Sequence, residues 1–410
     1  MTVGIGGPYL SGFGLTGKPL ANDSRLGPRS IPSSHRIAVA KRNCLEHTRR
    51  DLANFGLHEE PCMLSYAFES FGKPLAQVLR ETPQPAGDEV VLRIGSCGLC
   101  HSDLHLHDGY FDLGGGNKMD LGRFIAPPRV LGHEIAGTVV AVGPDVTDAA
   151  VGDRRVVFPW IGCGTCGSCA RGHEELCTAP RALGVNRDGG FADHVLVPHS
   201  RYLFAYDPMS EIQACTYACS GLTAYGALKK CAPLGADDTL LIIGAGGVGL
   251  SAIRMAVATL GVAAMVAEID RSKWDLAREA GAVDCVDPTD AGATKALMES
   301  CGGVAAAIDF VGAAATFAYG LSALRKGGKL VCVGLFGGVV PVMPATLPLR
   351  AVSITGSYVG SLTEMAEVMA LARRGDLPLL PLTTRPLAEV NDAMAALRSG
   401  AIRGRTVLQP

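Results

Sequence analysis

Four cysteines with short, regular spacing are the first residues that could carry chemistry. Cys163, Cys166, Cys169 and Cys177 form a C-x2-C-x2-C-x7-C pattern in the glycine-rich stretch CGTCGSCARGHEELC. Tetrahedral zinc needs four soft donors about 2.3 Å from its centre, and glycine turns let one short loop supply them all. An iron–sulfur cluster fits less well, because the last gap is longer than in the bacterial ferredoxin pattern and no proline follows. Two disulfides would be awkward at this spacing. The pattern therefore predicts a structural zinc site, with no coordination position left for substrate.

A second set of metal-ligating residues is spread over three stretches, CGLCHSDLH, LGHEIAG and ACSGLTAYGAL. Each stretch alone is weak evidence, because a buried cysteine is usually a small hydrophobe and Cys97 with Cys100 could instead be a redox pair. Together, Cys100, His133 and Cys219 would be three ligands that leave a fourth position on zinc open, as in catalytic sites. An alcohol bound there becomes more acidic. Asp103 is placed to fix the tautomer of the histidine.

A glycine turn follows the apolar run TLLII and precedes a helical stretch. Its residues are Gly244, Gly246, Gly247, Val248 and Gly249. In a strand–turn–helix context, such glycines let the backbone approach a pyrophosphate at the helix N-terminus. Glu268 ends the next strand, where a carboxylate accepts hydrogen bonds from ribose hydroxyls and repels a 2′-phosphate. The motif predicts NAD as the cofactor, while Arg271, three residues later, is the one argument for NADP.

Bulk properties restrict the class of protein. The chain has 410 residues, more than one compact core usually holds, so we expect two domains with appendages. A formal net charge of -2 gives no reason to expect nucleic acid or an anionic membrane as a partner. No apolar run reaches the ~18 residues typical of a membrane span. The fourteen cysteines cluster at short spacings, which indicates metal binding in a reducing compartment. These features predict a cytoplasmic protein.

The chain divides into an extension, an antiparallel β region and an α/β region. Residues 1–62 are rich in Gly, Ser, Pro and Arg, which predicts a disordered extension. It could also reflect an upstream start codon before Met63, or a targeting peptide. From there to 222, strand-like alternation predicts an antiparallel barrel-like domain with a zinc lobe at 160–180. Strand–helix alternation over 223–357 predicts a doubly wound parallel sheet. Residues 358–410 are expected to return to the first domain.

Together these motifs resemble the zinc-containing, medium-chain alcohol dehydrogenases, from about Met63 to Pro410. The resemblance implies a GroES-like catalytic domain split around a Rossmann domain, with the active site in the cleft between them. It implies hydride transfer between an alcohol and NAD, two zinc ions per chain, and a homodimer or homotetramer. The same fold also serves polyol, hydroxymethyl-thiol-adduct and terpenoid alcohol dehydrogenases. A non-catalytic cofactor-binding relative is a further alternative, whereas a zinc-free quinone reductase would lack both cysteine sets.

The resemblance also implies a role for each site residue. Cys100, His133 and Cys219 would hold catalytic zinc, and the four lobe cysteines structural zinc. The catalytic matches are Ser102 as proton acceptor, His105 as the outer end of the relay, Glu134 beside the metal and Asp103 behind the histidine. The remaining cofactor contacts would be His101 and Arg405 at the pyrophosphate, Thr223 near the nicotinamide, and Lys273 with Glu268 at the adenosine ribose.

Two further departures from the family pattern stand out beside the extension. Glu268 replaces the commoner aspartate, which moves the carboxylate by one methylene. The loop at 108–128 is longer than the compact members of this family need. Its sequence is DGYFDLGGGNKMDLGRFIAPP. It could shape the substrate entrance or a subunit contact, or be a surface insertion of no consequence.

Overall fold

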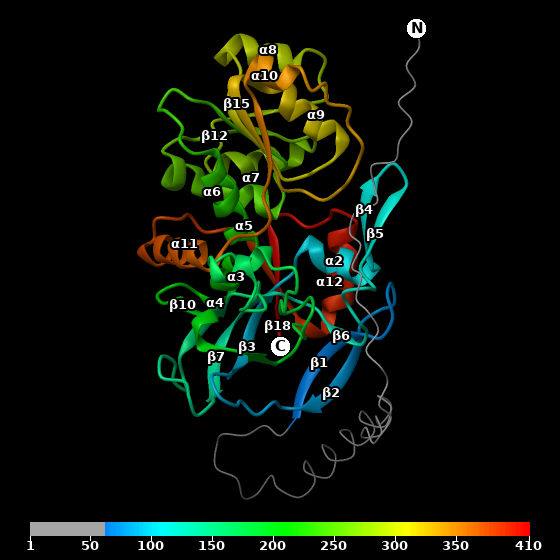
Figure 1. The fold of residues 1–410 in the computed structure, drawn as a ribbon, viewed down its shortest axis with the longest axis vertical. Coiled ribbons are helices and arrows are strands. Elements are labelled where there is room, and N and C mark those ends of the chain that lie inside the picture. The colour runs from blue at the N-terminus through cyan, green and yellow to red at the C-terminus, as the bar shows by residue number, and fades with distance from the viewer. Residues whose placement is uncertain (1–61) are drawn as a thin grey trace, which may run out of the picture.

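The computed structural model describes residues 62–410, which form two lobes (Figure 1). The predictions for residues 1–61, including a disordered extension or a targeting peptide, lie outside the described residues. One lobe contains the antiparallel sheets and the C-terminus, and the other contains a parallel sheet flanked by helices. The predicted α/β fold class, GroES-like plus Rossmann, is confirmed.

The first lobe is built on a seven-stranded sheet and a three-stranded sheet. The larger sheet contains β10 (Leu203–Ala205), β8 (Arg154–Val157), β7 (Glu134–Val142), β3 (Val90–Gly98), β18 (Arg405–Gln409) and β17 (Leu382–Pro386) in that order, with β9 (His194–Val197) also paired to β3. The smaller sheet contains β2 (Ala76–Glu81), β1 (Cys62–Phe68) and β6 (Arg129–Val130). β18 pairs antiparallel with β3, so the end of the chain lies beside the strand that leads to Cys100.

The second lobe contains a six-stranded sheet whose neighbouring strands are all parallel. Its order is β13 (Asp284–Val286), β12 (Ala264–Ala267), β11 (Leu240–Ile243), β14 (Val304–Asp309), β15 (Leu324–Cys332) and β16 (Ser353–Gly356). The chain therefore starts in the middle of the sheet and winds outward in both directions. In such sheets the ligand crevice forms where the strand order reverses, at the carboxyl ends of the strands.

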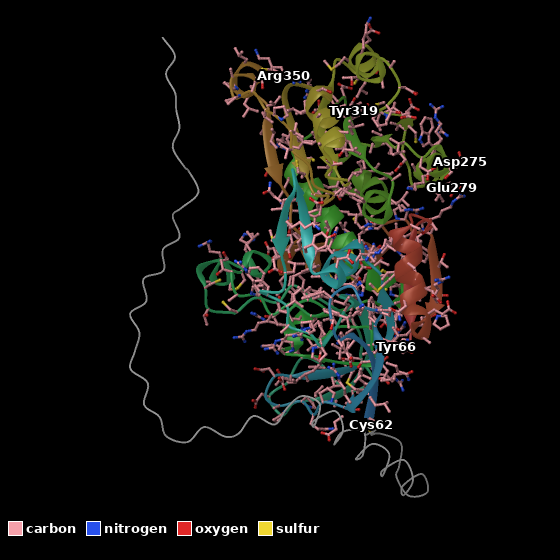
Figure 2. The ribbon with its side chains drawn as sticks, turned by 90° about the vertical axis from the view of Figure 1, so that its right-hand side faces the viewer. Cys62, Tyr66, Asp275, Glu279, Tyr319 and Arg350 are labelled. Atoms are coloured by element: carbon pink, nitrogen blue, oxygen red, sulfur yellow. The ribbon has the colours of Figure 1, made fainter. Side chains whose placement is uncertain are left out.

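The central strand β11 shows why this sheet is covered on both faces. All four of its residues are fully buried or nearly so. Because successive side chains of a strand point to opposite faces, Leu240 and Ile242 join one apolar core while Leu241 and Ile243 join another. The second core includes Tyr319 of α9, which lies in this lobe (Figure 2). A continuous apolar run in the sequence thus becomes a strand buried between two helical layers.

Helices connect the strands and join the lobes. The α-helices are α2 (His101–Asp108), α3 (Gly167–Ala170), α4 (Glu211–Ala214), α5 (Ser220–Cys231), α6 (Gly247–Leu260), α7 (Trp274–Glu279), α8 (Ala293–Cys301), α9 (Ala314–Ala323), α10 (Thr346–Arg350), α11 (Leu362–Arg374) and α12 (Val390–Arg398). The 3-10 turns are η1 (Glu174–Leu176), η2 (Ser200–Tyr202), η3 (Cys215–Ala218), η4 (Arg271–Lys273) and η5 (Leu387–Glu389). Within residues 62–410, none of these helices has the length and apolar character that crossing a membrane requires. α5 is buried along nearly its whole length, so it anchors the first lobe to the second.

The stretch expected as a long loop at 108–128 contains a β-hairpin instead. Strands β4 (Tyr110–Gly114) and β5 (Asn117–Asp120) pair antiparallel, and the three consecutive glycines form the turn. The hairpin reaches the second lobe, where the backbone N–H of Gly338 donates to the carbonyl of Leu113 at 3.4 Å. The alternation signal was missed because both strands are short and mostly solvent-exposed. The insertion therefore bridges the lobes.

Substituting Gly114 tests whether this bridge holds the hairpin in place. Gly114 has φ +85°, and a Cβ there would overlap the backbone of Gly338. Gly116 has a similar φ of +80° but open space around its Cβ position, so Gly116→Ala is a matched control that adds only backbone strain of about 1–2 kcal/mol. We expect Gly114→Ala to speed amide hydrogen exchange across residues 110–120 well beyond the control. Equal exchange in the two variants would contradict a cross-lobe contact.

Candidate active site

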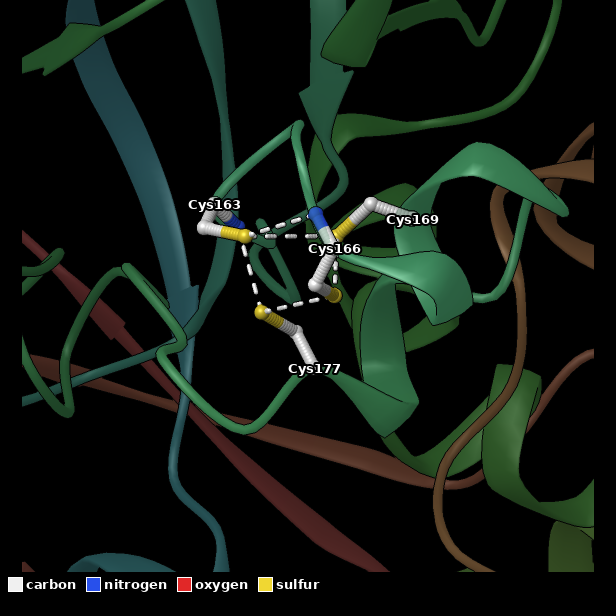
Figure 3. Close-up of side chains that lie close together, drawn as sticks. All are labelled: Cys163, Cys166, Cys169 and Cys177. Carbon is white, nitrogen blue, oxygen red and sulfur yellow. Dashed lines mark hydrogen bonds between the residues drawn. The ribbon is translucent and has the colours of Figure 1, made fainter.

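The four cysteines of the zinc lobe converge on one point (Figure 3). Their sulfur atoms all lie within 4.8 Å of one another. The individual separations include 3.5 Å between Cys166 and Cys169, 3.8 Å between Cys166 and Cys177, and 4.0 Å between Cys163 and Cys169. Four sulfurs around tetrahedral zinc at about 2.3 Å are roughly 3.8 Å apart, so these separations fit a zinc ion and are too long for disulfides.

Hydrogen bonds to Cys163 favour its thiolate over the thiol, whereas burial raises the pKa of Cys169. The Thr165 hydroxyl lies 3.5 Å from the sulfur of Cys163, and the backbone N–H groups of Thr165 and Cys166 donate to the same sulfur. These contacts lower the pKa of Cys163 to about 5. A thiolate is the form that ligates a metal, so the loop is prepared for a cation.

Glu174 fixes the zinc lobe to the rest of the domain. Its buried carboxylate accepts hydrogen bonds from the Gly162 backbone N–H at 2.9 Å and from the Tyr202 hydroxyl at 2.8 Å. Arg201 neutralises its charge at 2.7 Å. Sequence analysis did not single out Glu174, because nothing in its spacing distinguishes it from the adjacent Glu175.

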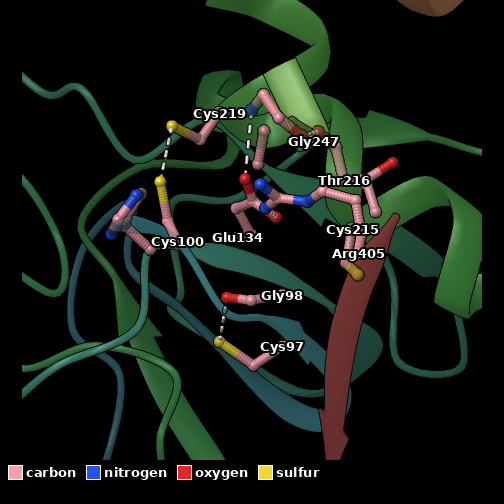
Figure 4. Close-up of polar contacts among 12 residues, drawn as sticks. Cys97, Gly98, Cys100, Glu134, Cys215, Thr216, Cys219, Gly247 and Arg405 are labelled. Atoms are coloured by element: carbon pink, nitrogen blue, oxygen red, sulfur yellow. Dashed lines mark hydrogen bonds and ion pairs between the residues drawn. The ribbon is translucent and has the colours of Figure 1, made fainter. Parts of the chain in front are cut away.

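The second metal group assembles from three separate elements. Cys100 is the N-cap of α2, His133 directly precedes β7, and Cys219 is the N-cap of α5. All three are buried, and their ligand atoms lie within 4.8 Å of one another. The two sulfurs are 3.9 Å apart (Figure 4). The hydrogen bond with Cys219 lowers the pKa of Cys100 despite the opposing effect of burial.

The imidazole of His133 has the environment of a metal ligand. Its Nδ1 atom is 3.2 Å from Oδ1 of Asp103. Both ring nitrogens are buried, and neither meets the geometry of a hydrogen bond to the described residues. A buried polar atom without a partner is costly, and coordination of a cation beside two thiols would remove that cost. This donor set therefore fits zinc.

Asp103 connects the start of α2 to the segment that carries His133. Its carboxylate is fully buried and accepts hydrogen bonds from the backbone N–H groups of Cys100 at 2.9 Å and Gly132 at 3.2 Å. The other end of the helix is held by a bidentate ion pair, 2.7–2.8 Å, between Asp108 and Arg398 of α12. The helix that contains Ser102 and His105 is thus fixed at both ends.

Glu134 and Arg405 form a buried ion pair between β7 and β18. The other carboxylate oxygen of Glu134 accepts from the backbone N–H of Ser220, next to Cys219, at 3.0 Å. The side chain of Arg405 also lies against Gly247, because a Cβ on that glycine would clash with it (Figure 4). One arginine therefore contacts both the surroundings of the metal group and the dinucleotide turn.

The glycine turn has the geometry that its sequence predicts. Gly244 adopts φ +95°, which favours glycine. A Cβ on Gly249 would overlap the carbonyl oxygen of Gly244, so the helix packs closely on the strand. A Cβ on Gly246 would meet nothing within 4 Å. This open side lies at the N-terminus of the 14-residue helix α6, where backbone N–H groups favour an anion. Val248 packs against the core.

The remaining predicted residues lie near these two features. Ser102 places its hydroxyl 3.1 Å from the sulfur of Cys100. The ring of His105 is 6.0 Å from that of His101, which in turn lies 5.4 Å from Phe336 of the second lobe. Thr223 is buried on α5, one turn after Cys219.

Glu268 and Lys273 lie just after β12, the strand next to the edge of the parallel sheet. Glu268 follows β12 and accepts a hydrogen bond from the Ala245 backbone N–H at 2.8 Å. The carboxylate therefore reaches the glycine turn. Lys273 belongs to η4 and lies 3.6 Å from Asp270.

Two aromatic residues near the metal group were missed by sequence analysis. Trp160 is buried, its ring centroid lies 5.2 Å from that of His133, and its indole N–H donates to the carbonyl of Ala218 at 3.0 Å. Tyr358 contacts the outer side of Trp160 at 6.0 Å. The available signal was the position of Trp160 just before the cysteine pattern, but an aromatic residue in a strand-like run is usually core.

The second lobe has a parallel sheet with a glycine turn, and a buried cysteine–histidine–cysteine group lies near that turn. These features define a Rossmann-type dehydrogenase with a metal centre. Residues 86–207 match the alcohol dehydrogenase GroES-like domain, and residues 247–374 match the zinc-binding dehydrogenase family. NAD-dependent alcohol dehydrogenases of Sulfurisphaera tokodaii and Saccharolobus solfataricus are each 36% identical over 345 residues, which is 83% of this chain and 97% of theirs. The alcohol dehydrogenase structure from Aeropyrum pernix superposes with a TM-score of 0.76 at 30% identity, covering 85% of this chain and all of that one. The chain belongs to the zinc-containing medium-chain alcohol dehydrogenase family.

Metal content tests the two ligand groups separately. We expect the purified chain to carry about two zinc ions, one per group. Cys166→Ser should reduce this to about one and lower the melting temperature, because a structural zinc contributes folding energy directly. Cys100→Ser should also lose one ion, while retaining the ion of the lobe. Elemental analysis with a thermal melt distinguishes the variants, and a wild-type chain that holds one zinc ion when zinc is supplied would contradict the second site.

Proposed function

We propose that the chain catalyses the reversible oxidation of a primary or secondary alcohol to an aldehyde or ketone, with NAD as hydride acceptor and two zinc ions per chain. The observation that carries this proposal is the position of Arg405. Its guanidinium pairs with Glu134 beside the cysteine–histidine–cysteine group, and its side chain lies against Gly247 of the dinucleotide turn. A metal centre and a nucleotide site that share one buried residue are close enough to act on the same substrate.

Cys100, His133 and Cys219 are the residues that would hold the catalytic zinc. When bound, zinc supplies Lewis-acid chemistry that makes a coordinated alcohol acidic and stabilises charge on its oxygen. The protein contributes the rigidity of the site. Asp103 holds the imidazole and the first turn of α2 together, and the indole of Trp160 covers one side of His133.

The glycine turn and its surroundings would hold NAD, which supplies the hydride acceptor when bound. The pyrophosphate would lie at the N-terminus of α6, at Gly246, Gly247 and Val248, with His101 and Arg405 nearby. Glu268 and Lys273 would contact the adenosine ribose, and Thr223 would lie near the nicotinamide. A carboxylate at the ribose favours NAD over NADP because it repels a 2′-phosphate.

The proton of the alcohol would leave through α2. Ser102 lies next to Cys100 and would accept the proton at Oγ, and His105, one turn later on the same helix, would carry it outward from an imidazole nitrogen. Burial lowers the pKa of His105 below its ordinary value of 6.5, and the adjacent His101 acts in the same direction. His105 is thus neutral at physiological pH, which is the form that accepts a proton.

Glu134 would act in the exchange of ligands at the metal and not in the transfer of the proton or the hydride. Its carboxylate is held by Arg405 and by the backbone of Ser220, so it can approach the metal only after the contact with Arg405 is released. Its position beside Cys219 supports the role expected for this residue during exchange of ligands.

The organisation of the chain follows the same proposal. Residues 63–222 with 358–410 would form the catalytic domain, and 223–357 the NAD-binding domain. A homodimer or homotetramer is proposed from family membership, and light scattering would test it. A cytoplasmic location is proposed from the clustering of the cysteines at metal-ligand spacings, which differs from the even spread of a disulfide framework.

Replacing Cys100 tests the catalytic group. We expect Cys100→Ser to lower the rate of NADH formation from ethanol or benzyl alcohol by at least about a thousandfold, because an open metal site accounts for several kcal/mol of transition-state stabilisation. Cys97→Ser is the matched control: this thiol is equally buried three residues earlier but lies outside the ligand group, and its activity should stay within about threefold of wild type. The measurement is stopped-flow NADH formation with NAD. Normal turnover by the Cys100 variant would contradict Cys100 as a ligand of the catalytic zinc.

The pH profile tests the relay. Because the pKa of His105 lies below 6.5, alcohol oxidation should stay constant down to that pH and fall below it as the imidazole becomes protonated. His105→Asn should lower kcat by about 10- to 100-fold and remove this acid limb, since general base catalysis is typically worth ~10²-fold or more. Steady-state rates from pH 5 to 9 give the answer. An unchanged acid limb in the variant would assign the titration to another group.

A further inference from the structure

Arg271 is the basic residue nearest in sequence to the carboxylate proposed to bind the adenosine ribose. It follows Glu268 by three residues, at the start of η4. The backbone N–H of Glu268 donates to the carbonyl of Val286 at 3.0 Å, so the ends of β12 and β13 lie side by side. An arginine here would normally favour a dinucleotide with a 2′-phosphate, because its planar fork matches phosphate oxygens.

The guanidinium of Arg271 is engaged by two aspartates that follow β13. Its Nη2 atom lies 3.0 Å from Oδ2 of Asp290 and 3.5 Å from Oδ2 of Asp287. The other oxygen of Asp287 accepts hydrogen bonds from the backbone N–H and the hydroxyl of Thr289, at 3.0 and 2.6 Å. The turn DPTD therefore presents two carboxylates in a fixed geometry.

Trp274 holds the arginine from a third side. The guanidinium carbon lies 5.2 Å from the centre of the indole ring, within the range of a cation–π interaction. The indole N–H donates to the carbonyl of Glu268 at 2.9 Å, which fixes the ring to the end of β12. Trp274 thus orients the arginine and is itself fixed to the backbone of Glu268.

Around the ends of β12 and β13 the net charge of Glu268, Asp270, Arg271, Lys273, Asp287 and Asp290 is negative, and both basic side chains are paired. Lys273 lies 3.6 Å from Asp270, and Arg271 pairs with Asp287 and Asp290. Together with Glu268, four carboxylates face two basic groups. A phosphate arriving at the ribose 2′ position would meet no unpaired cation among these residues.

We propose that Asp287 and Asp290 are specificity-determining residues that keep Arg271 from binding a 2′-phosphate and so exclude NADP. This inference rests on the proposed function and deepens it. Glu268 repels the 2′-phosphate directly, whereas the two aspartates remove the cation that would offset that repulsion. NAD lacks the 2′-phosphate, so neither the repulsion by Glu268 nor the pairing of Arg271 acts against its binding.

The test is nucleotide binding to the zinc-loaded, full-length chain by titration calorimetry. The probes are adenosine 2′,5′-bisphosphate, which contains the 2′-phosphate but no nicotinamide, and adenosine 5′-monophosphate, which lacks the 2′-phosphate. In Asp287→Asn/Asp290→Asn, the bisphosphate should bind about tenfold more tightly, because Arg271 is released from two partly exposed ion pairs. Binding of the monophosphate should change less than twofold. Asparagine keeps the acceptor for Thr289, and the more exposed Asp290→Asn alone should give part of the gain.

Two further variants separate release of Arg271 from a general loss of negative charge. Adding Arg271→Ala to the double variant should abolish the gain. The matched control, Glu279→Gln, removes a carboxylate from an exposed position on the adjacent helix α7 (Figure 2) without touching Arg271 or breaking the ion pair of Arg278 with Asp275, and should leave bisphosphate binding unchanged. A similar gain in this control, or a gain that persists without Arg271, would overturn the inference.

The failure of this inference is distinguishable from failure of the proposed function. A wild-type chain that does not bind NADH would refute NAD dependence and the inference with it. A chain that binds NADH, but whose double aspartate variant shows no gain for the bisphosphate, would refute the inference alone. Activity with NADP in the variants is a secondary readout, because binding of the bisphosphate does not depend on hydride transfer.

Discussion

The buried ion pair of Glu134 and Arg405 is the contact on which the rest of the site depends. Charged groups rarely leave water unless a partner of opposite charge meets them. Here the partners come from β7 and from β18, the last strand of the described residues. Burial raises the pKa of Glu134 to about 7, although Arg405 opposes this. The C-terminal strand pairs within the first lobe, and Arg405 on it contacts both the surroundings of the metal group and the glycine turn.

Helix α2 plays the complementary role on the opposite side of the metal group. It is only eight residues long and contains three histidines, so its own propensity contributes little. Its position comes from its ends, through Asp103 at the first turn and Asp108 at the last. A short polar helix fixed in this way can present ionisable side chains to a cleft without a large apolar face. Packing supplies the position, and the side chains remain available for chemistry.

Much of the site could be predicted because the relevant signals are local. The four lobe cysteines lie within one loop, and the glycine turn lies between an apolar strand and a helix, so spacing alone identified both. Cys100, His133 and Cys219 come from distant stretches, and only the combined pattern joined them. The fold class followed from strand–helix alternation, which β11 and α6 display clearly.

Other features depend on tertiary contacts that no local pattern encodes. Glu174 supports the zinc lobe through Gly162 and Tyr202, which are separated from it in sequence. The role of Trp160 depends on its contact with the ring of His133, which lies 27 residues earlier in the sequence. Strand β13 is three residues long and one of them is buried, too short for a periodic signal. The stretch that forms the β4–β5 hairpin was predicted as a loop, because its exposed strands lack apolar alternation and its turn consists of glycine.

Gly114 of the β4–β5 hairpin packs against Gly338 of the second lobe, so at this point the two lobes meet through backbone rather than through side chains. The side chains of Leu113 and Val339 beside it are exposed, whereas a Cβ on Gly114 would overlap the backbone of Gly338. Transplanting this hairpin into a relative would therefore require the recipient to receive the 334–339 loop as well, because one half of the junction has no docking site without the other.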